Sequence, residues 1–227
     1  MYALMTLLAQ TIEVGVTAAA RGVGKARTKR AVQRAELHTC VDLVALTGAA
    51  GTAPPAEVNA RAAGEPIIAP LSGAKCVWYV VRVYERFYAW RPGPLGPAHV
   101  ERQITVAEQT GGRLLIRDAT GEVWVDPAGA DLSLGATSYS GFEGRTGDGT
   151  LLARVGQLLD RPVRARHQAM TIGFLVEEWI VRDGEELHVV GQPRTEAGDV
   201  VLGKPALRPF VIDKRAPTPV ELSRSRD

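Results

Sequence analysis

The sequence predicts a mainly β fold, a β-barrel or partly closed sheet, with an N-terminal helix and one short amphipathic helix that make the overall content α+β. Residues 76–84 are almost entirely β-branched and aromatic, which is typical of a strand covered on both faces. Residues 113–126 hold two short apolar runs around an Asp-Ala-Thr-Gly turn, the pattern of a β-hairpin. Residues 150–160 place their leucines and valine on one helical face.

Length and composition fit one globular domain with an appendage. The chain has 227 residues, of which 45% are hydrophobic and 23% charged, and a formal net charge of +2. This charge balance indicates no particular partner. The two cysteines, Cys40 and Cys76, are too few for a zinc site of their own, and we interpret them as small buried hydrophobes. A reducing compartment fits this content, although a disulfide between the two stays open.

The first predicted element is an apolar helix over residues 1–20. A helix of this length spans about 30 Å, the thickness of a bilayer core. Basic residues follow it, with no acid between Glu13 and Glu36, which is the positive-inside pattern of an N-terminus outside and the rest in the cytoplasm. The candidate contacts to a membrane or another anionic surface are Arg21, Lys25, Arg27, Lys29, Arg30 and Arg34.

Three placements of this helix stay open. It can span a bilayer, where Glu13 costs several kcal/mol unless it is paired or protonated. It can lie flat on an anionic surface, where each nearby basic residue contributes about 1 kcal/mol. It can also pack as a soluble helix on the domain or on another subunit. We do not expect nucleic acid as a partner, because no aromatic residues interleave the basic cluster.

The predicted strands then follow in chain order. Small residues interrupt the first, at 43–53, and a sharp Pro-Leu-Ser-Gly turn at 70–73 precedes the long central strand. The other predicted strands lie at 66–68, 76–90, 100–106, 113–117, 122–126, 170–181, 186–191, 200–202 and 210–212. The helix at 150–160, which ends before Pro162, is expected to cover an open end of the barrel or sheet.

The second half of the central strand interleaves aromatic residues with Arg82 and Arg86. Such a strand can stack bases or sugars. We favour a plainer interpretation, in which the aromatic residues face the core and the arginines face solvent on one alternating strand.

Two segments are candidate binding loops for a ligand or a partner protein. Residues 91–99 are rich in Pro and Gly, and residues 129–149 read as one long polar loop. The candidate contact residues in these loops are Arg91, His99, Tyr139 and Phe142.

The sequence offers no recognisable catalytic or metal-binding pattern. Its histidines are scattered, and Glu177 and Glu178 are adjacent on a strand, so their side chains point to opposite faces and cannot act as a pair. Asp118 and Asp126 are interpreted as turn and strand-end residues rather than as cation ligands. We therefore expect no cofactor and no metal, and the balance is against an enzyme without deciding the point.

Three stretches together resemble the GIDE domain, also called the BAM ("beside a membrane") domain. They are 69–85, APLSGAKCVWYVVRVYE; 114–132, LLIRDATGEVWVDPAGADL; and 177–191, EEWIVRDGEELHVVG. The resemblance spans roughly residues 40–212. A mitochondrial RING-type ubiquitin ligase carries this domain, and many bacterial membrane proteins carry it without a RING.

The resemblance implies a bacterial, RING-less module and gives no catalytic activity. A RING binds zinc through a cysteine-rich array, which two cysteines cannot build. The family's second membrane helix, usually placed after the domain, is also missing, which leaves residues 1–20 as the expected anchor.

The predicted organisation is a helix and basic segment over 1–35, a GIDE/BAM-like β domain over 36–213 and a loose tail over 214–227. The predicted function is a non-catalytic binding or scaffold module beside the cytoplasmic face of a membrane. One alternative is a structural subunit of a homo-oligomer, soluble in the cytoplasm, with the N-terminal helix at the interface. Another is an accessory subunit of a ubiquitin-ligase-like system without its own RING.

Overall fold

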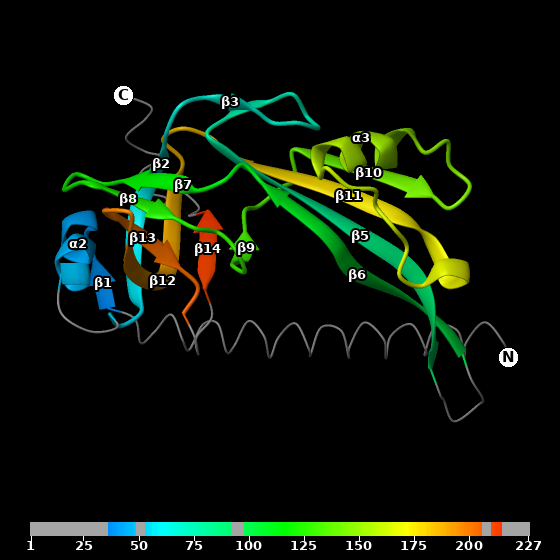
Figure 1. Ribbon diagram of the computed structural model, residues 1–227, viewed down its shortest axis with the longest axis horizontal. Coiled ribbons are helices and arrows are strands. Elements are labelled where there is room, and N and C mark those ends of the chain that lie inside the picture. Colours follow the sequence, from blue (N-terminus) through cyan, green and yellow to red (C-terminus); the bar gives the residue numbers. More distant parts are fainter. Residues whose placement is uncertain (1–35, 49–52, 92–97, 206–209, 215–227) are drawn as a thin grey trace, which may run out of the picture.

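A computed structural model describes residues 36–48, 53–91, 98–205 and 210–214. Figure 1 shows a barrel and a four-stranded sheet side by side. The predicted mainly β fold with a short amphipathic helix is confirmed, and of the two predicted forms, a barrel or a partly closed sheet, the structure has the barrel. The predicted helix at 1–20 and its basic cluster lie outside the described residues.

Five strands form a closed barrel, because the last strand in the order around it also pairs with the first. In order around the barrel they are β2 (Ala56–Ala63), β7 (Leu114–Arg117), β8 (Glu122–Val125), β13 (Asp199–Gly203) and β12 (Glu186–Glu196). β12 pairs antiparallel with β13 and also with β2, which returns the order to its start. The β7–β8 pair is the hairpin predicted at 113–126.

Three short strands extend this sheet outside the ring. β1 (Glu36–His38) lies parallel to β2, β14 (Val211–Lys214) pairs with β12, and β9 (Asp131–Ser133) lies parallel to β14. β14 therefore runs one residue into the segment predicted as a tail. The barrel interior is apolar, with Val58, Ile116, Leu187 and Leu202 buried.

A helix, α2 (Cys40–Gly48), covers one end of the barrel, and the strand predicted at 43–53 is wrong. Cys40 and Leu43 are buried and Leu46 is half-buried against the barrel core, at spacings of three that suit a helix. The helix begins where Thr39 and Asp42 hydrogen-bond each other reciprocally, with Asp42 accepting from the Thr39 amide at 2.9 Å. This pair resembles a capping box, which marks the start of a helix. We interpreted the small residues that follow as interruptions of a strand, and the helix start signal outweighs them.

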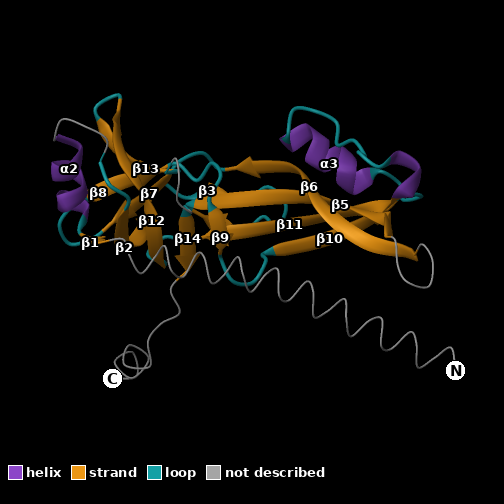
Figure 2. Cartoon of the chain, turned by 90° about the horizontal axis from the view of Figure 1, so that it is seen from below, coloured by secondary structure: helices purple, strands orange, loops and turns teal. Residues whose placement is uncertain are grey.

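The second sheet has the order β10 (Tyr139–Gly144), β11 (Thr171–Val181), β5 (Trp78–Arg91) and β6 (Ala98–Thr110), all antiparallel. Helix α3 (Thr150–Leu158) lies across one face, as Figure 2 shows, and a 3-10 turn, η1 (Gln168–Met170), precedes β11. β3 (Ile67–Ile68) and β4 (Lys75–Cys76) form a small hairpin around the turn predicted at 70–73. Gly73 has φ 70°, so the left-handed position expected of it is confirmed.

The segment 129–149 is not a single long loop, because β9 and β10 lie within it. Its glycines obscured the strand pattern in the sequence. At Gly173 of the neighbouring strand, a Cβ would lie 2.4 Å from the Glu143 carbonyl oxygen, so β10 approaches more closely than any other residue allows.

The β5–β11 pair joins the two parts of the fold. Trp78, Val80 and Val181 belong to the barrel core, whereas Val81, Val83 and Val176 pack beneath α3. The indole nitrogen of Trp78 donates to the Gly112 carbonyl oxygen at 2.8 Å, which fixes the start of β5 in the barrel. Residues 76–84 are thus covered on both faces in part, as the sequence predicted.

Asp118 ties the β7–β8 turn to the start of α2. Its carboxylate accepts from the amide of Cys40 at 2.8 Å and from the amide of Thr120 at 2.7 Å. Burial would raise the pKa of Asp118, but the hydrogen bonds from Thr120 and Cys40 outweigh it and lower the pKa to about 2. Burial and the neighbouring Asp118 raise the pKa of Cys40 to about 12, so its thiol stays protonated at neutral pH.

We predict that Asp118→Asn lowers the free energy of unfolding by about 1–3 kcal/mol at pH 7, measured by urea denaturation, because a charged acceptor of several amide hydrogen bonds is lost. A carboxyl with a lowered folded-state pKa stabilises above its unfolded-state pKa and loses that contribution as pH falls toward 2. The difference from wild type should therefore shrink at pH 3. Asp183→Asn, at an exposed turn, is the matched control, and equal losses in both variants at pH 7 would contradict the prediction.

Candidate functional site

The four-stranded sheet presents two unlike faces, and both bear on function. α3 and the segments beside it cover one face, while the other is the solvent face, defined here by Arg82, Tyr84 and Arg86 of β5, Leu175, Glu177 and Trp179 of β11, and Phe142 of β10. Cross-strand partners share a face, so the register decides which side chains meet.

On the covered face, Glu178 of β11 is fully buried and binds the turn at 70–73. Its carboxylate accepts from the Leu71 amide at 2.8 Å, from the Ser72 amide at 3.1 Å and from the hydroxyls of Ser72 and Ser138. Arg154 of α3 donates to the Pro70 carbonyl oxygen at 2.6 Å from the other side. The backbone amides of the turn thus donate to β11, and its backbone carbonyl oxygen accepts from α3.

Glu85 of β5 holds the segment between α3 and β11 in the same way. It is also fully buried, and its carboxylate accepts from the Arg166 amide at 2.9 Å, the His167 amide at 3.0 Å and the Thr171 hydroxyl. Burial would raise the pKa of Glu85, but the hydrogen bonds from Thr171, His167 and Arg166 lower it below its ordinary value. Glu85 is therefore a structural anion at neutral pH.

Glu143 of β10 is the third buried carboxylate, and it accepts from the Leu152 amide of α3 at 2.8 Å. An acid near the start of a helix also interacts favourably with the helix dipole. The three carboxylates stand on three adjacent strands and each holds one covering segment. Their hydrogen bonds go to backbone amides and nearby side chains of the covering segments, so we interpret this cluster as an anchoring device.

The solvent face gathers aromatic and arginine side chains on the same side of β5. Tyr79 and Phe87 point to the covered face, whereas Tyr84 shares the solvent face with Arg82 and Arg86, because even-numbered residues of β5 point that way. Our prediction that aromatic residues face the core and arginines face solvent is therefore correct for Tyr79, Phe87 and the two arginines, and wrong for Tyr84.

Two cation–π contacts order this face. The guanidinium of Arg86 lies 5.1 Å from the ring centroid of Phe142, and that of Arg82 lies 5.9 Å from Trp179. Both arginines also pair with carboxylates of β6, Arg82 with Glu108 and Arg86 with Glu101. The face is thus aromatic, with its positive charges locally compensated.

The predicted contact residues lie on strands rather than in loops. Tyr139 and Phe142 are both in β10 and point to opposite faces, so Tyr139 packs beneath α3 while Phe142 is 47% exposed on the solvent face. Arg91 and His99 lie at the facing ends of β5 and β6. The loop at 92–97 between them lies outside the described residues.

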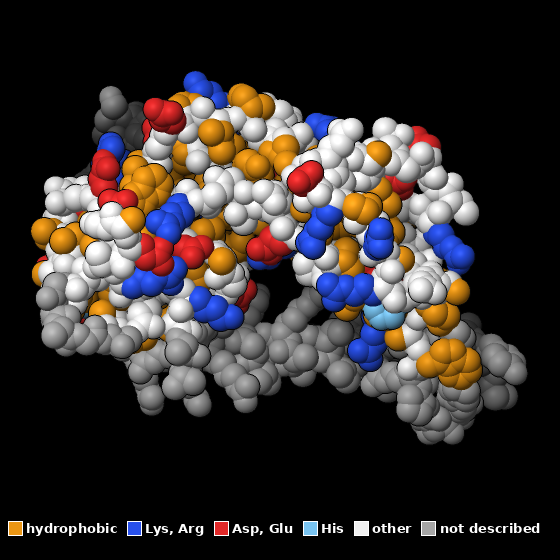
Figure 3. Space-filling model, in the orientation of Figure 1, with side chains coloured by type: hydrophobic (Ala, Val, Ile, Leu, Met, Phe, Trp, Pro, Cys, Tyr) orange, Lys and Arg blue, Asp and Glu red, His pale blue; other side chains and the backbone are white. Residues whose placement is uncertain are grey.

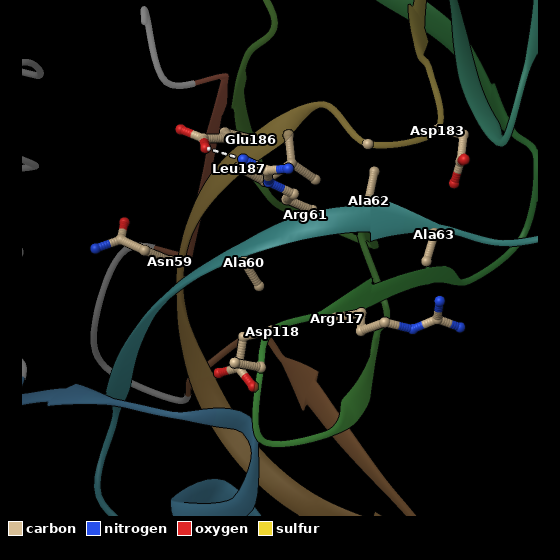
Figure 4. A pocket seen from close by; sticks show the side chains of 12 residues that line it. Asn59, Ala60, Arg61, Ala62, Ala63, Arg117, Asp118, Asp183, Glu186 and Leu187 are labelled. Carbon is tan, nitrogen blue, oxygen red and sulfur yellow. Dashed lines mark hydrogen bonds and ion pairs between the residues drawn. The ribbon is translucent and has the colours of Figure 1, made fainter. Parts of the chain in front are cut away.

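A hollow of about 490 Å³ on the barrel surface is the other candidate site (Figure 4). Glu186, Arg61, Arg117 and Glu122 form one row across four strands, with Arg61 paired to Glu186 at 3.1 Å and Arg117 paired to Glu122. Asp118 is engaged with α2, as described above. Most of the charged side chains around this hollow are thus already paired, and Asp183 is the lining carboxylate with no ion pair or hydrogen bond among the described residues.

The scattered histidines and cysteines have local roles. His167 stacks on Phe87 with ring centroids 3.4 Å apart, and His188 lies 2.9 Å from Glu57. Both cysteines are buried and free. Within the described ranges, no three His, Cys, Asp or Glu side chains are grouped as metal ligands would be.

None of the helices that the structure describes has the length and apolarity needed to cross a bilayer.

Comparison with known protein families gives one match. The model of the GIDE family, described as E3 ubiquitin ligase, matches residues 103–224, more than half of the chain. The match includes two of the three stretches quoted above and leaves out the stretch at 69–85. No curated protein and no solved structure matches the chain.

We predict that Glu178→Gln lowers the free energy of unfolding by about 1–3 kcal/mol, because it replaces a charged acceptor of two amides and two hydroxyls with a group that carries its own donors. Amide hydrogen exchange should accelerate most at Leu71 and Ser72. Glu177→Gln, one residue away on the solvent face, is the matched control. Unchanged exchange at both amides would contradict the anchoring role.

Proposed function

The chain belongs to the GIDE family, and from that premise we propose that it is a non-catalytic binding module beside a membrane that recognises a partner protein. We also propose that the chain is one of the family members that lack a RING. With two cysteines, both buried, these 227 residues cannot supply the zinc ligands of a RING.

The solvent face of the four-stranded sheet carries the proposal. Protein interfaces are enriched in aromatic residues and arginine, and their central contacts are often Trp, Tyr and Arg. Tyr84, Phe142 and Trp179 lie on one face with Arg82 and Arg86, and the cation–π contacts hold the two arginines in place. The buried carboxylates stiffen the opposite face, so a partner would meet a largely preformed surface.

A photo-crosslinking amino acid at position 142 tests the partner surface. We expect a discrete adduct from living cells, because Phe142 is exposed on the solvent face, on the edge strand β10. The matched control places the same amino acid at Ile68, which is 65% exposed in the small β3–β4 hairpin. Arg86→Glu should reduce the adduct at 142 at least threefold, whereas Arg61→Glu on the barrel should leave it unchanged.

The mass of the adduct also separates the alternatives. An adduct of twice the chain's mass would favour the homo-oligomeric subunit. A component of a ubiquitin-like conjugation system would favour the accessory subunit, which the family description suggests. Adducts of equal yield from positions 142 and 68, or none from either, would remove the solvent face as the partner surface.

The membrane part of the proposal rests on the sequence of residues 1–35, which lie outside the described residues. An apolar stretch followed by six basic residues suits an N-terminal anchor with the domain on the cytoplasmic face. The domain would then be held close to its partner by the same anchor.

Flotation with liposomes of neutral and anionic lipid tests the anchor. We expect the full chain to float and to remain bound through high salt and alkaline pH, because salt screens exposed charge and leaves an inserted apolar helix in place. A chain lacking residues 1–35 should stay in solution. A full chain in which the six basic residues of the segment 21–34 are replaced by Gln separates insertion of the helix from attraction to the anionic surface. A soluble multimer without flotation would instead make the helix an assembly element.

A further inference from the structure

A groove with an apolar floor and a cationic rim lies at the edge of the four-stranded sheet. Its volume is about 460 Å³; Val106 and Ala107 of β6 form one side, and the segment from Leu159 to Arg166, after α3, forms the other. β6 is the last strand in the sheet order, so one of its edges has no neighbour among the described strands. We call this feature the arginine groove.

The rim arginines are Arg161, Arg164 and Arg166, and their guanidinium groups have no ion-pair or hydrogen-bond partner among the described residues. The lack of a partner distinguishes these three arginines from most arginines of the fold. Figure 3 shows Lys and Arg side chains gathered around a histidine on the half of the molecule that holds the four-stranded sheet. The arginines that do bind a carboxylate or a carbonyl oxygen are Arg61, Arg82, Arg86, Arg113, Arg117, Arg145, Arg154, Arg182 and Arg194.

The acids around the groove do not neutralise it. Glu85 beneath the loop is buried and bound to backbone amides. Glu101 and Glu108 of β6 point to the solvent face and pair with Arg86 and Arg82. Asp160 is the one acid in the segment itself, next to Arg161, so the rim keeps a net positive charge.

The loop that carries the arginines is extended and held in place. Val163 and Ala165 pack inward against the core beneath α3, while Arg164 and Arg166 point outward, the alternation of a strand. Glu85 binds the amides of Arg166 and His167, and His167 stacks on Phe87. In an extended chain the Cα atoms of alternate residues, here Arg164 and Arg166, are spaced by about 7 Å.

We propose that the arginine groove binds an acidic peptide segment of a partner protein, in extended conformation along the free edge of β6. The peptide would lie against Val106 and Ala107 of β6, where the pairing with β5 is irregular, and carboxylates at alternate positions would meet the rim guanidinium groups. The apolar floor suits the methylene groups of glutamate better than a small anion. The inference rests on the proposed function only in that the occupant belongs to a protein, and it concerns a different surface from Phe142.

Fluorescence polarisation with a labelled octapeptide of alternating Glu and Val tests the groove in the full chain. We expect saturable binding that weakens between 50 and 300 mM NaCl. The double variant Arg164→Gln, Arg166→Gln should weaken binding at least tenfold. The variant Arg61→Gln, Arg117→Gln removes the same charge from the barrel and should remain within twofold of wild type, and a peptide with Gln in place of Glu should not bind.

Equal losses in both double variants would overturn the proposal, because they would reveal attraction to net charge alone. Binding of anionic vesicles that depends on Arg164 and Arg166, without binding of the peptide, would also overturn it in favour of a lipid surface. Thermal unfolding of both double variants checks that the fold persists. Peptide binding that depends on Arg164 and Arg166, without an adduct at position 142, would support the groove as a binding site and would contradict the solvent face as the partner surface.

Discussion

The buried carboxylate of Glu178 is the contact on which the arrangement of the second sheet depends. A helix of nine residues is too short to cover one face of a four-stranded sheet whose other three strands have 11 to 14 residues beside the six of β10, so turns and extended segments must cover the rest. Such segments carry backbone amides into a buried environment, where each unsatisfied donor costs about 1–3 kcal/mol. Glu178, Glu85 and Glu143 meet that requirement from three adjacent strands, and their own burial is tolerable because the same amides satisfy them.

This arrangement separates two kinds of arginine. On the solvent face, Arg82 and Arg86 are paired with carboxylates of β6 and stacked on aromatic rings, so they contribute shape and planar contact area rather than net charge. In the arginine groove the guanidinium groups have no partner among the residues that the structure describes, and the loop that carries them is fixed by Glu85. The carboxylate of Glu85 thus links the interior of the sheet to the charges at its edge, because its hydrogen bond from the backbone amide of Arg166 fixes the position of that residue.

Local pattern was enough for the parts of the fold that local contacts decide. The hairpin at 113–126, the turn at 70–73 and the helix at 150–160 follow from turn residues and helical spacing, and the structure has all three. The helix α2 was missed because the pair Thr39 and Asp42 is a brief signal beside a run of small residues. Glu178 could not be recognised, because its partners Leu71 and Ser72 lie more than 100 residues away in the chain. In the sequence it is one of two adjacent acids, and nothing marks which of them is buried.

The family match covers residues 103–224, yet neither sheet is complete within that span. The barrel closes only through β2, which bridges β7 and β12, and the second sheet needs β5 between β6 and β11. A segment starting at 103 would leave the buried Glu178 without the turn that satisfies it, and the apolar face of β11 without its neighbour. We infer that the folding unit begins before the matched segment and takes in β2, the turn at 70–73 and β5. The stretch at 69–85 belongs to this unit for a physical reason, since it supplies both the amides that Glu178 binds and the strand that joins the barrel to the sheet.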